Sequence, residues 1–186
     1  MVELLQIVDS EGVTVGEMEK LAAHRDGGTL HRAISVFLLD DTGRLLIQRR
    51  AAAKYHFAGL WANTCCSHPL RDETPAEAAR RAVQFELGIE PAIEEVGVII
   101  YSAHDAVSGL TEREYDHIFV GVWNDTLAPN PAEVKGVHWV SSFELRQELE
   151  AHPERFAPWL PVIVRSIREQ LKDQESAFGK FLAELG

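Results

Sequence analysis

Three histidines and a pair of glutamates are the residues whose types and spacing could hold a metal ion. His24, His31 and His68 offer imidazole nitrogens, and Glu112 and Glu114 offer carboxylate oxygens. Because side chains alternate along an extended chain, Glu112 and Glu114 project from the same face and could share one cation. Taken alone, however, a histidine is more often an ordinary surface or structural residue, and a carboxylate pair at a strand end is more often solvated.

Two neighbouring cysteines supply a second kind of chemistry. Cys65 and Cys66 are the only cysteines of the chain, and adjacent residues cannot adopt unstrained disulfide geometry. In an extended segment Cys66 and His68 share one face, whereas Cys65 points to the other. We therefore expect Cys66 to be the reactive cysteine and Cys65 to pack, although a buried cysteine often serves only as a small hydrophobe. The other histidines are interpreted as surface or structural residues: His56, His104, His117, His138 and His152.

The elements that position these residues begin with short β-rich segments. The patterns predict strands at 4–8, 12–16, 33–39 and 44–48, and a helix at 17–23. The turn Asp40-Asp41-Thr42-Gly43 between the third and fourth strands is typical of a hairpin. This half of the chain is therefore expected to be mostly β-structure.

A helix at 75–87 is marked by signals at both of its ends. Thr74 and Glu77 have the spacing of a capping box, Pro75 occupies the first helical position, and Gly88 supplies the stop. The later predicted elements are strands near 96–102, 114–123 and 136–140, and helices at 143–151, 159–171 and 175–185. Mixed strands with a central helix and C-terminal helices predict an α/β or α+β sandwich.

The composition excludes several classes of protein. The chain has 186 residues, of which 46% are hydrophobic and 25% charged, as expected of one folded domain. Its formal net charge of −11 disfavours nucleic acid as a partner. Its apolar runs are far shorter than the ~20 residues that span a bilayer, and the N-terminus lacks the features of a signal peptide. We expect a cytoplasmic protein that does not act on membranes.

The predicted helix resembles the signature of the Nudix superfamily. Glu73, Arg81, Glu86 and Gly88 match that signature in register. The chain departs from it at Ser67, Ala82 and Phe85, where the signature has Gly, Glu and Glu. Positions 82, 85 and 86 lie on one side of a helix, so only one of three metal-facing carboxylates is present. This loss counts against ordinary Nudix hydrolysis with several Mg²⁺ ions.

The departures are similar to those of one branch, the type 1 isopentenyl diphosphate isomerases. The matching segments are 22–24, 30–33, 48–51, Lys54, 59–69, 86–88, 112–116 and 156–159. The stretch Asn-Thr-Cys-Cys-Ser-His-Pro at 63–69 is the most specific of them, and the resemblance covers about residues 4–170. It implies one Nudix-like domain, a mixed β-sheet sandwiched between helices. The expected parts are an N-terminal hairpin and short helix at 1–30, a core at 31–145 and C-terminal helices at 146–186, in a monomer.

The resemblance also implies two metal sites. His24, His31, His68, Glu112 and Glu114 would hold Zn²⁺ or Mn²⁺, which imidazole and carboxylate ligands suit. Glu86 would hold Mg²⁺ together with the diphosphate of the substrate.

The implied reaction interconverts isopentenyl and dimethylallyl diphosphate by moving a proton across an alkene through a tertiary carbocation. By resemblance, Cys66 and Glu114 transfer the protons with help from Tyr101. The resemblance gives substrate-binding roles to Lys20, Arg50, Lys54, Ser67 and Trp159. The face of the Trp159 ring would stabilise positive charge, although an isolated tryptophan is more often plain core. Family members commonly carry arginine where this chain has Ala82, which bears on its affinity for the substrate.

Three alternatives stay open at this point. A Nudix diphosphate hydrolase would use Glu73 and Glu86. A metal-binding interaction module would use Cys66 and His68 only structurally. A related enzyme could protonate longer prenyl diphosphates to start cyclisation.

Overall fold

A central strand, β3 (His31–Leu39), organises the sheet of the computed structural model, which describes residues 3–172 and 175–185. It pairs antiparallel with β1 (Leu4–Val8), β4 (Leu45–Arg50) and β6 (Cys65–Ser67), and parallel with β8 (Thr111–Val122). The remaining strands are β2 (Thr14–Glu19), β5 (Trp61–Ala62), β7 (Ile93–His104) and β9 (Val134–Val140). The chain therefore brings segments that are about 80 residues apart in sequence into direct register, such as His31 opposite Glu114.

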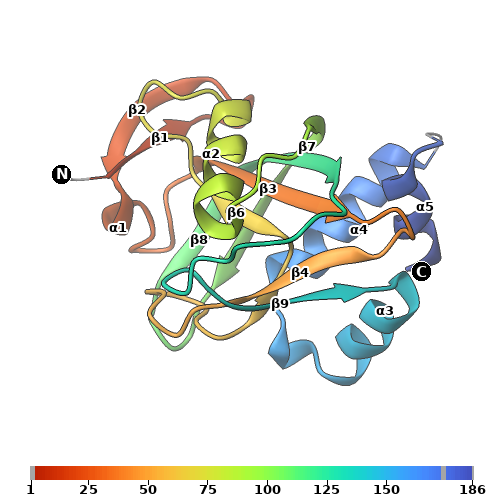
Figure 1. The fold of residues 1–186 in the computed structure, drawn as a ribbon. Coiled ribbons are helices and arrows are strands. Elements are labelled where there is room, and N and C mark those ends of the chain that lie inside the picture. Colours follow the sequence, from red (N-terminus) through yellow and green to blue (C-terminus); the bar gives the residue numbers. More distant parts are fainter. Residues whose placement is uncertain (1–2, 173–174, 186) are drawn as a thin grey trace.

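Helices cover both faces of this sheet, as Figure 1 shows. Along β3 the side chains alternate: Val36 and Leu38 pack on the face covered by α2 (Pro75–Leu87), whereas Phe37 and Leu39 pack on the other. That second face is covered by α3 (Ser142–Ala151), α4 (Trp159–Leu171) and α5 (Ala177–Glu184), with a short 3₁₀ turn at Pro153–Arg155. The expected α+β sandwich is confirmed.

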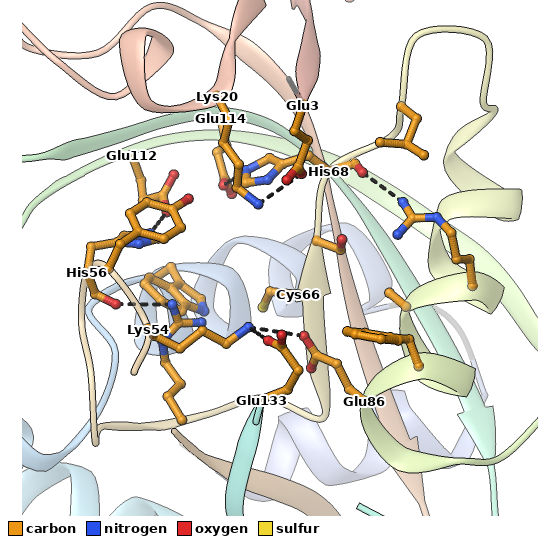
Figure 2. Close-up of a pocket in the computed structure, with 18 of the residues that line it drawn as sticks. Glu3, Lys20, Lys54, His56, Cys66, His68, Glu86, Glu112, Glu114 and Glu133 are labelled. Atoms are coloured by element: carbon orange, nitrogen blue, oxygen red, sulfur yellow. Dashed lines mark hydrogen bonds and ion pairs between the residues drawn. The ribbon is translucent and has the colours of Figure 1, made fainter. Parts of the chain in front are cut away.

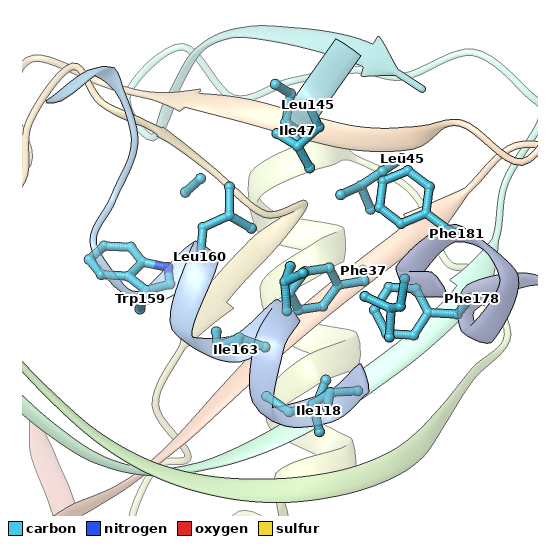
Figure 3. Packing of buried hydrophobic residues seen from close by; sticks show 14 of the residues in the cluster. Phe37, Leu45, Ile47, Ile118, Leu145, Trp159, Leu160, Ile163, Phe178 and Phe181 are labelled. Atoms are coloured by element: carbon cyan, nitrogen blue, oxygen red, sulfur yellow. The ribbon is translucent and has the colours of Figure 1, made fainter. Parts of the chain in front are cut away.

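The C-terminal helices complete the larger cluster of buried side chains (Figure 3). Phe178 and Phe181 of α5 are 2% and 3% exposed, and the ring centroids of Phe37 and Phe178 are 5.2 Å apart. The sequence prediction of a helix at 175–185 is thus close to α5. The predicted tail after Lys172 includes Asp173, Gln174 and Gly186, which lie outside the described residues. Among the residues described, no helix combines the length and apolar character needed to cross a bilayer.

Helix α2 has the bounds that its terminal signals predict. The hydroxyl of Thr74 accepts from the Glu77 amide, and the Glu77 carboxylate accepts from the Thr74 amide. At the other end Gly88 adopts a left-handed conformation with φ of 68°, and its amide donates to the Gln84 carbonyl. These local bonds fix where α2 ends and therefore where Glu86, in its last turn, is presented.

The N-terminal boundary differs from the prediction. The expected helix at 17–23 is wrong in its first half, because β2 continues to Glu19 in antiparallel pairing with β1. Only α1 (Lys20–Ala23) is helical, and the Glu19 carboxylate caps it by accepting from the Leu21 and Ala22 amides. Likewise, β8 begins at Thr111, so Glu112 lies inside the strand and not before its mouth.

Candidate active site and metal centre

A cavity of about 650 Å³ opens between the end of α2, the loop at 51–60 and the edges of β6 and β8. Its volume suits a small organic ligand. The predicted site residues that line it are Lys20, Arg50, Lys54, Cys66, Ser67, His68, Glu86, Tyr101, Glu112, Glu114 and Trp159. Ala82 and Phe85 form part of the wall beside Glu86, and Figure 2 shows the labelled side chains facing the space.

The predicted metal ligands converge at one side of this cavity. His24 follows α1, His31 begins β3, His68 follows β6, and Glu112 lies on β8. One ligand atom of each lies within 4.8 Å of the others, and all four side chains are buried. The fifth predicted ligand, Glu114, has its Oε1 atom 3.0 Å from His68 Nε2 and 3.9 Å from His31 Nε2. The structure thus brings together all five residues of the predicted set.

The hydrogen bonds of the outer imidazole nitrogens orient this cluster. His24 Nδ1 lies 2.6 Å from the Lys20 carbonyl and His31 Nδ1 lies 2.8 Å from the Thr29 carbonyl. Because a carbonyl only accepts, each Nδ1 carries the proton and each Nε2 turns a lone pair inward.

The inward-facing atoms fit a divalent cation. His31 Nε2 lies 3.2 Å from His68 Nε2. His24 Nε2 and Glu112 Oε2 are 2.8 Å apart, yet within the described part of the chain neither atom has a hydrogen-bond partner of proper geometry. Imidazole nitrogens and a carboxylate oxygen that converge in this way are the ligands that a divalent cation such as Zn²⁺ takes.

The charges of the cluster follow from burial and from mutual contacts. Burial lowers the pKa of His31 to about 4, and burial together with neighbouring His31 lowers the pKa of His68 well below its usual value. Although burial opposes it, contact with His24 and His56 holds the pKa of Glu112 well below the ordinary range. Contact with Glu112 likewise outweighs burial and raises the pKa of His24. At neutral pH the centre therefore contains neutral His31 and His68 beside the Glu112 carboxylate.

His56 is a contact that the sequence analysis missed. Its buried ring lines the cavity, and its Nε2 contacts Glu112 Oε1. Because the acceptor is a carboxylate held ionised, Nε2 carries the proton and donates it, which leaves Glu112 Oε2 facing His24. The sequence alone suggested that His56 is an ordinary surface or structural residue. Its position two residues after Lys54 is the signal that could have placed it in the same loop at the site.

The two cysteines point to opposite sides of β6, as alternation predicts. Cys65 packs in the cluster under α2, with its sulfur 3.3 Å from Glu86 Oε2. Cys66 lines the cavity, and its sulfur lies 3.1 Å from Asn63 Oδ1 and 3.5 Å from Ser35 Oγ. Burial, followed by the charge of Asp116, raises the pKa of the Cys66 thiol to about 12. Cys66 therefore keeps its proton at neutral pH.

Glu114 faces the same cavity from β8. Tyr101, its partner in the β7 and β8 register, donates its hydroxyl proton to Glu114 Oε2 at 2.5 Å. Burial, then the neighbouring charges of Glu112 and Asp116, raises the pKa of Glu114 well above its ordinary value. The tyrosine bond fixes the orientation of this carboxyl group.

Asn63 links Cys66 to the aromatic wall and was not singled out from the sequence. Its Oδ1 accepts from Trp159 Nε1 at 3.1 Å as well as from the Cys66 sulfur. Its Nδ2 donates to the carbonyls of Val36 and Cys65, which fixes which end of the amide faces the cavity. The guanidinium of Arg50 lies 5.3 Å from the Trp159 ring centroid.

Three positive side chains, Lys20, Arg50 and Lys54, line the cavity. Arg50 is buried and donates to the carbonyls of His56 and Phe57, so it also holds the loop at 51–60. Lys20 pairs with Glu3 at 2.9 Å, and Lys54 lies 3.5 Å from Glu86. The whole protein has a net charge of −11, so positive side chains gathered in one cavity stand out. They favour the binding of an anionic ligand there.

Glu73, the second carboxylate of the hydrolase alternative, lies elsewhere. Its two oxygens accept from Arg81 Nε and Nη2 at 2.6 and 2.7 Å, and one of them also accepts from the Leu70 amide. A bidentate arginine pair of this kind holds the segment before α2 in place. Glu73 therefore has a structural position.

The chain matches a known protein family and named relatives over most of its length. The family model described as NUDIX domain matches residues 29–160. Over 172 residues the chain is 46% identical to the isopentenyl-diphosphate Delta-isomerase of Streptomyces coelicolor, covering 91% of this chain and 86% of that protein. It is 43% identical to the protein of the same name from Halorhodospira halophila, covering 90% and 95%.

The solved structures agree on the fold. A protein from Deinococcus radiodurans superposes with a TM-score of 0.73 at 21% identity, over 89% of this chain and 99% of that one. A MutT protein from Methanosarcina mazei superposes with a TM-score of 0.61 at 15% identity, over 79% and 96%.

Proposed function

Since the chain belongs to the isopentenyl-diphosphate Delta-isomerases, within the NUDIX domain family, we propose that Cys66 and Glu114 are the two groups that move the proton. The enzyme converts isopentenyl diphosphate to dimethylallyl diphosphate, a small-molecule prenyl diphosphate reaction. The observation that carries the assignment is that both side chains line one cavity from strands on either side of β3. Glu114 is buried and Cys66 is half-buried, and burial raises the pKa of both groups above their ordinary values.

The reaction adds a proton to the terminal alkene carbon and removes a different proton from carbon 2. The two electrons of the old double bond form the new C–H bond, and those of the broken C–H bond form the new double bond. Cys66 and Glu114 serve as the acid and the base on the two sides of the hydrocarbon. Tyr101 orients Glu114, because its hydroxyl donates to Oε2.

The intermediate is a tertiary carbocation, which the walls of the cavity must stabilise without attacking. The Trp159 ring is 3% exposed and is held by Asn63, so its face is fixed next to the cavity. An aromatic face attracts a cation and offers no lone pair for bond formation. A buried ring at this wall also limits the access of the water that would turn the cation into an alcohol.

A divalent metal ion suits the buried histidine and glutamate cluster. We assign Zn²⁺ or Mn²⁺ to His24, His31, His68, Glu112 and Glu114, because these ions accept mixed imidazole and carboxylate ligands. When bound, such an ion stabilises the anionic form of Glu114 and lowers the cost of its proton release. We assign Mg²⁺ to Glu86, where it accompanies the diphosphate.

We assign the diphosphate itself to the positive side chains of the cavity. Lys20, Lys54 and Arg50 supply cationic donors, and Ser67 supplies a hydroxyl group. Ala82 offers no donor at the position where the family resemblance implies an arginine, so we expect weaker binding of the diphosphate. The cytoplasmic location, the monomeric state and the part boundaries at residues 30 and 145 stay predictions.

The test is incubation with isopentenyl diphosphate and Mg²⁺ in D₂O, followed by NMR. We expect dimethylallyl diphosphate labelled at its new methyl group, and exchange of deuterium into recovered substrate. Inorganic phosphate or pyrophosphate released at a comparable rate would favour the hydrolase alternative. Cyclic products from longer prenyl diphosphates, without deuterium in the five-carbon substrate, would favour the cyclase alternative. Metal bound tightly without any turnover would favour the interaction module.

A further inference from the structure

Lys54 lies between two carboxylates, although only one of them belongs to the proposed Mg²⁺ site. Its Nζ is 3.5 Å from Glu86 Oε1 and contacts Glu133 Oε2 more closely (Figure 2). Glu133 precedes β9 and lines the same cavity. One ammonium group therefore pairs with two acidic side chains at the wall assigned to the diphosphate.

The two oxygens of Glu86 have different partners. Oε2 accepts from Gln48 Nε2 at 2.8 Å and lies 3.3 Å from the Cys65 sulfur, so it is held from the protein interior. Oε1 faces Lys54. A cation that binds Glu86 from the cavity must therefore approach Oε1, beside which the ammonium group of Lys54 stands at 3.5 Å, farther than from Glu133 Oε2.

The backbone holds Glu133 in a fixed relation to both neighbours. The Asn130 amide donates to the Glu86 carbonyl at 2.8 Å, and the Glu133 amide closes a turn onto the Asn130 carbonyl at 3.0 Å. On the other side, the Ala51 amide donates to the Glu133 carbonyl at 2.9 Å, three residues before Lys54. Backbone hydrogen bonds thus connect the segment that contains Glu133 both to the end of α2 and to the loop that carries Lys54.

From this geometry we propose that Glu133 is a positioning residue that draws Lys54 away from Glu86 and so leaves Glu86 Oε1 available to Mg²⁺. The inference rests on the proposed function, because it assumes that Mg²⁺ binds at Glu86 with the diphosphate. Without Glu133, Lys54 has Glu86 as its remaining carboxylate partner and competes with the metal ion. With Glu133 present, the ammonium group stays at the rim, where it can meet the incoming phosphate.

The test measures the dependence on Mg²⁺ of the wild-type enzyme and of Glu133→Gln. Two readouts are used: the Mg²⁺ concentration for half-maximal isomerisation, and calorimetric binding of inorganic pyrophosphate at a series of Mg²⁺ concentrations. We expect both Mg²⁺ requirements to rise on the order of 10-fold in Glu133→Gln, the size of coupling common within ion-pair networks. At saturating Mg²⁺ we expect kcat to stay close to that of the wild type. Glu150→Gln, an exposed substitution on α3, is the matched control and should change neither readout.

A second background separates this role from two others. In Lys54→Gln the competing ammonium group is gone, so adding Glu133→Gln should no longer raise the Mg²⁺ requirement. If the rise persists there, Glu133 binds the metal directly and the inference is wrong. If Glu133→Gln lowers the unfolding temperature and leaves the Mg²⁺ requirement unchanged, Glu133 is only structural and the inference is again wrong.

Glu133→Asp provides a variant that keeps the charge should the glutamine variant not fold. Its shorter side chain withdraws the carboxylate from Lys54, and we expect a smaller rise in the same direction. Failure of the wild-type enzyme to isomerise the substrate would contradict the proposed function. Normal isomerisation with an unchanged Mg²⁺ requirement in both Glu133 variants would contradict this inference alone.

Discussion

At the scale of single residues, the two neighbouring cysteines are expected to have different roles, one in the reaction and one in packing. Cys66 meets the cavity, whereas Cys65 is fully enclosed under α2. We expect Cys66→Ala and Cys66→Ser to lower kcat by ~10²-fold to 10⁴-fold or more, because each removes a proton-transfer group. Cys65→Ala should keep most of the activity. Steady-state kinetics of the three variants tests this, and an inactive Cys65→Ala beside an active Cys66→Ser would reverse the assignment.

Substitutions of the two buried glutamates of the cavity are expected to have different effects. Glu86→Gln should weaken binding of the diphosphate, since it removes the carboxylate assigned to Mg²⁺. Glu114→Gln should leave binding largely intact but eliminate proton exchange. Calorimetry with the substrate, combined with deuterium exchange followed by NMR, distinguishes these outcomes. Loss of phosphate release in Glu86→Gln with its retention in Cys66→Ala would instead indicate a hydrolase.

At the scale of elements, the metal centre depends on the convergence of α1, β3, β6 and β8. After exhaustive chelation, we expect Mg²⁺ alone to give weak isomerisation and stoichiometric Zn²⁺ or Mn²⁺ to restore it. Acid should oppose the restoration, because His24, whose pKa is raised above 6.5, must lose its proton before Nε2 can bind metal. Below that pKa the affinity should fall about tenfold per pH unit for each displaced proton.

Competition with a chromophoric chelator between pH 5 and 8 measures this affinity. Substituting His117, which lies outside the metal cluster and pairs with Glu95, provides a control. Affinity that does not vary with pH, or full activity in protein shown by metal analysis to contain only Mg²⁺, would remove the histidines from the mechanism.

The elements also show which parts of the structure can be read from sequence. Helix α2 was predicted to the residue because Thr74, Pro75 and Gly88 act on neighbouring backbone groups. The end of β2 was misplaced because Glu17 and Glu19 are held by pairing with β1, a contact that no local pattern reveals. Alternation correctly placed Glu112 and Glu114 on one face, since it is a property of any strand.

Contacts between distant segments account for what the sequence analysis left out. Asn63 matters because α4 brings Trp159 against it, 96 residues later. Glu133 matters because a turn after β8 returns to the end of α2. Neither relation has a spacing that can be recognised before the sheet order is known. The ligand set was available only through its resemblance to a family, because five residues spread from 24 to 114 form no local motif.

At the scale of the whole molecule, the C-terminal helices close the core on the face opposite α2. Phe178→Ala should lower the free energy of unfolding by ~3 to 5 kcal/mol, the usual cost of emptying a buried phenylalanine site. Because Phe178 is not among the residues that line the cavity, the kcat of the folded fraction should change little. Urea denaturation with parallel kinetics tests both statements. Phe143→Ala, at a side chain that is 55% exposed, is the control and should cost much less.

The environment of the Cys66 thiol also affects how readily the protein is oxidised. Peroxides and disulfides react with thiolates, and a thiol with a pKa of about 12 is almost entirely protonated at neutral pH. Its neighbour Cys65 is enclosed and has a pKa raised by burial as well. We therefore expect both sulfurs to resist oxidation to sulfenic acid, the product that disables many reactive cysteines.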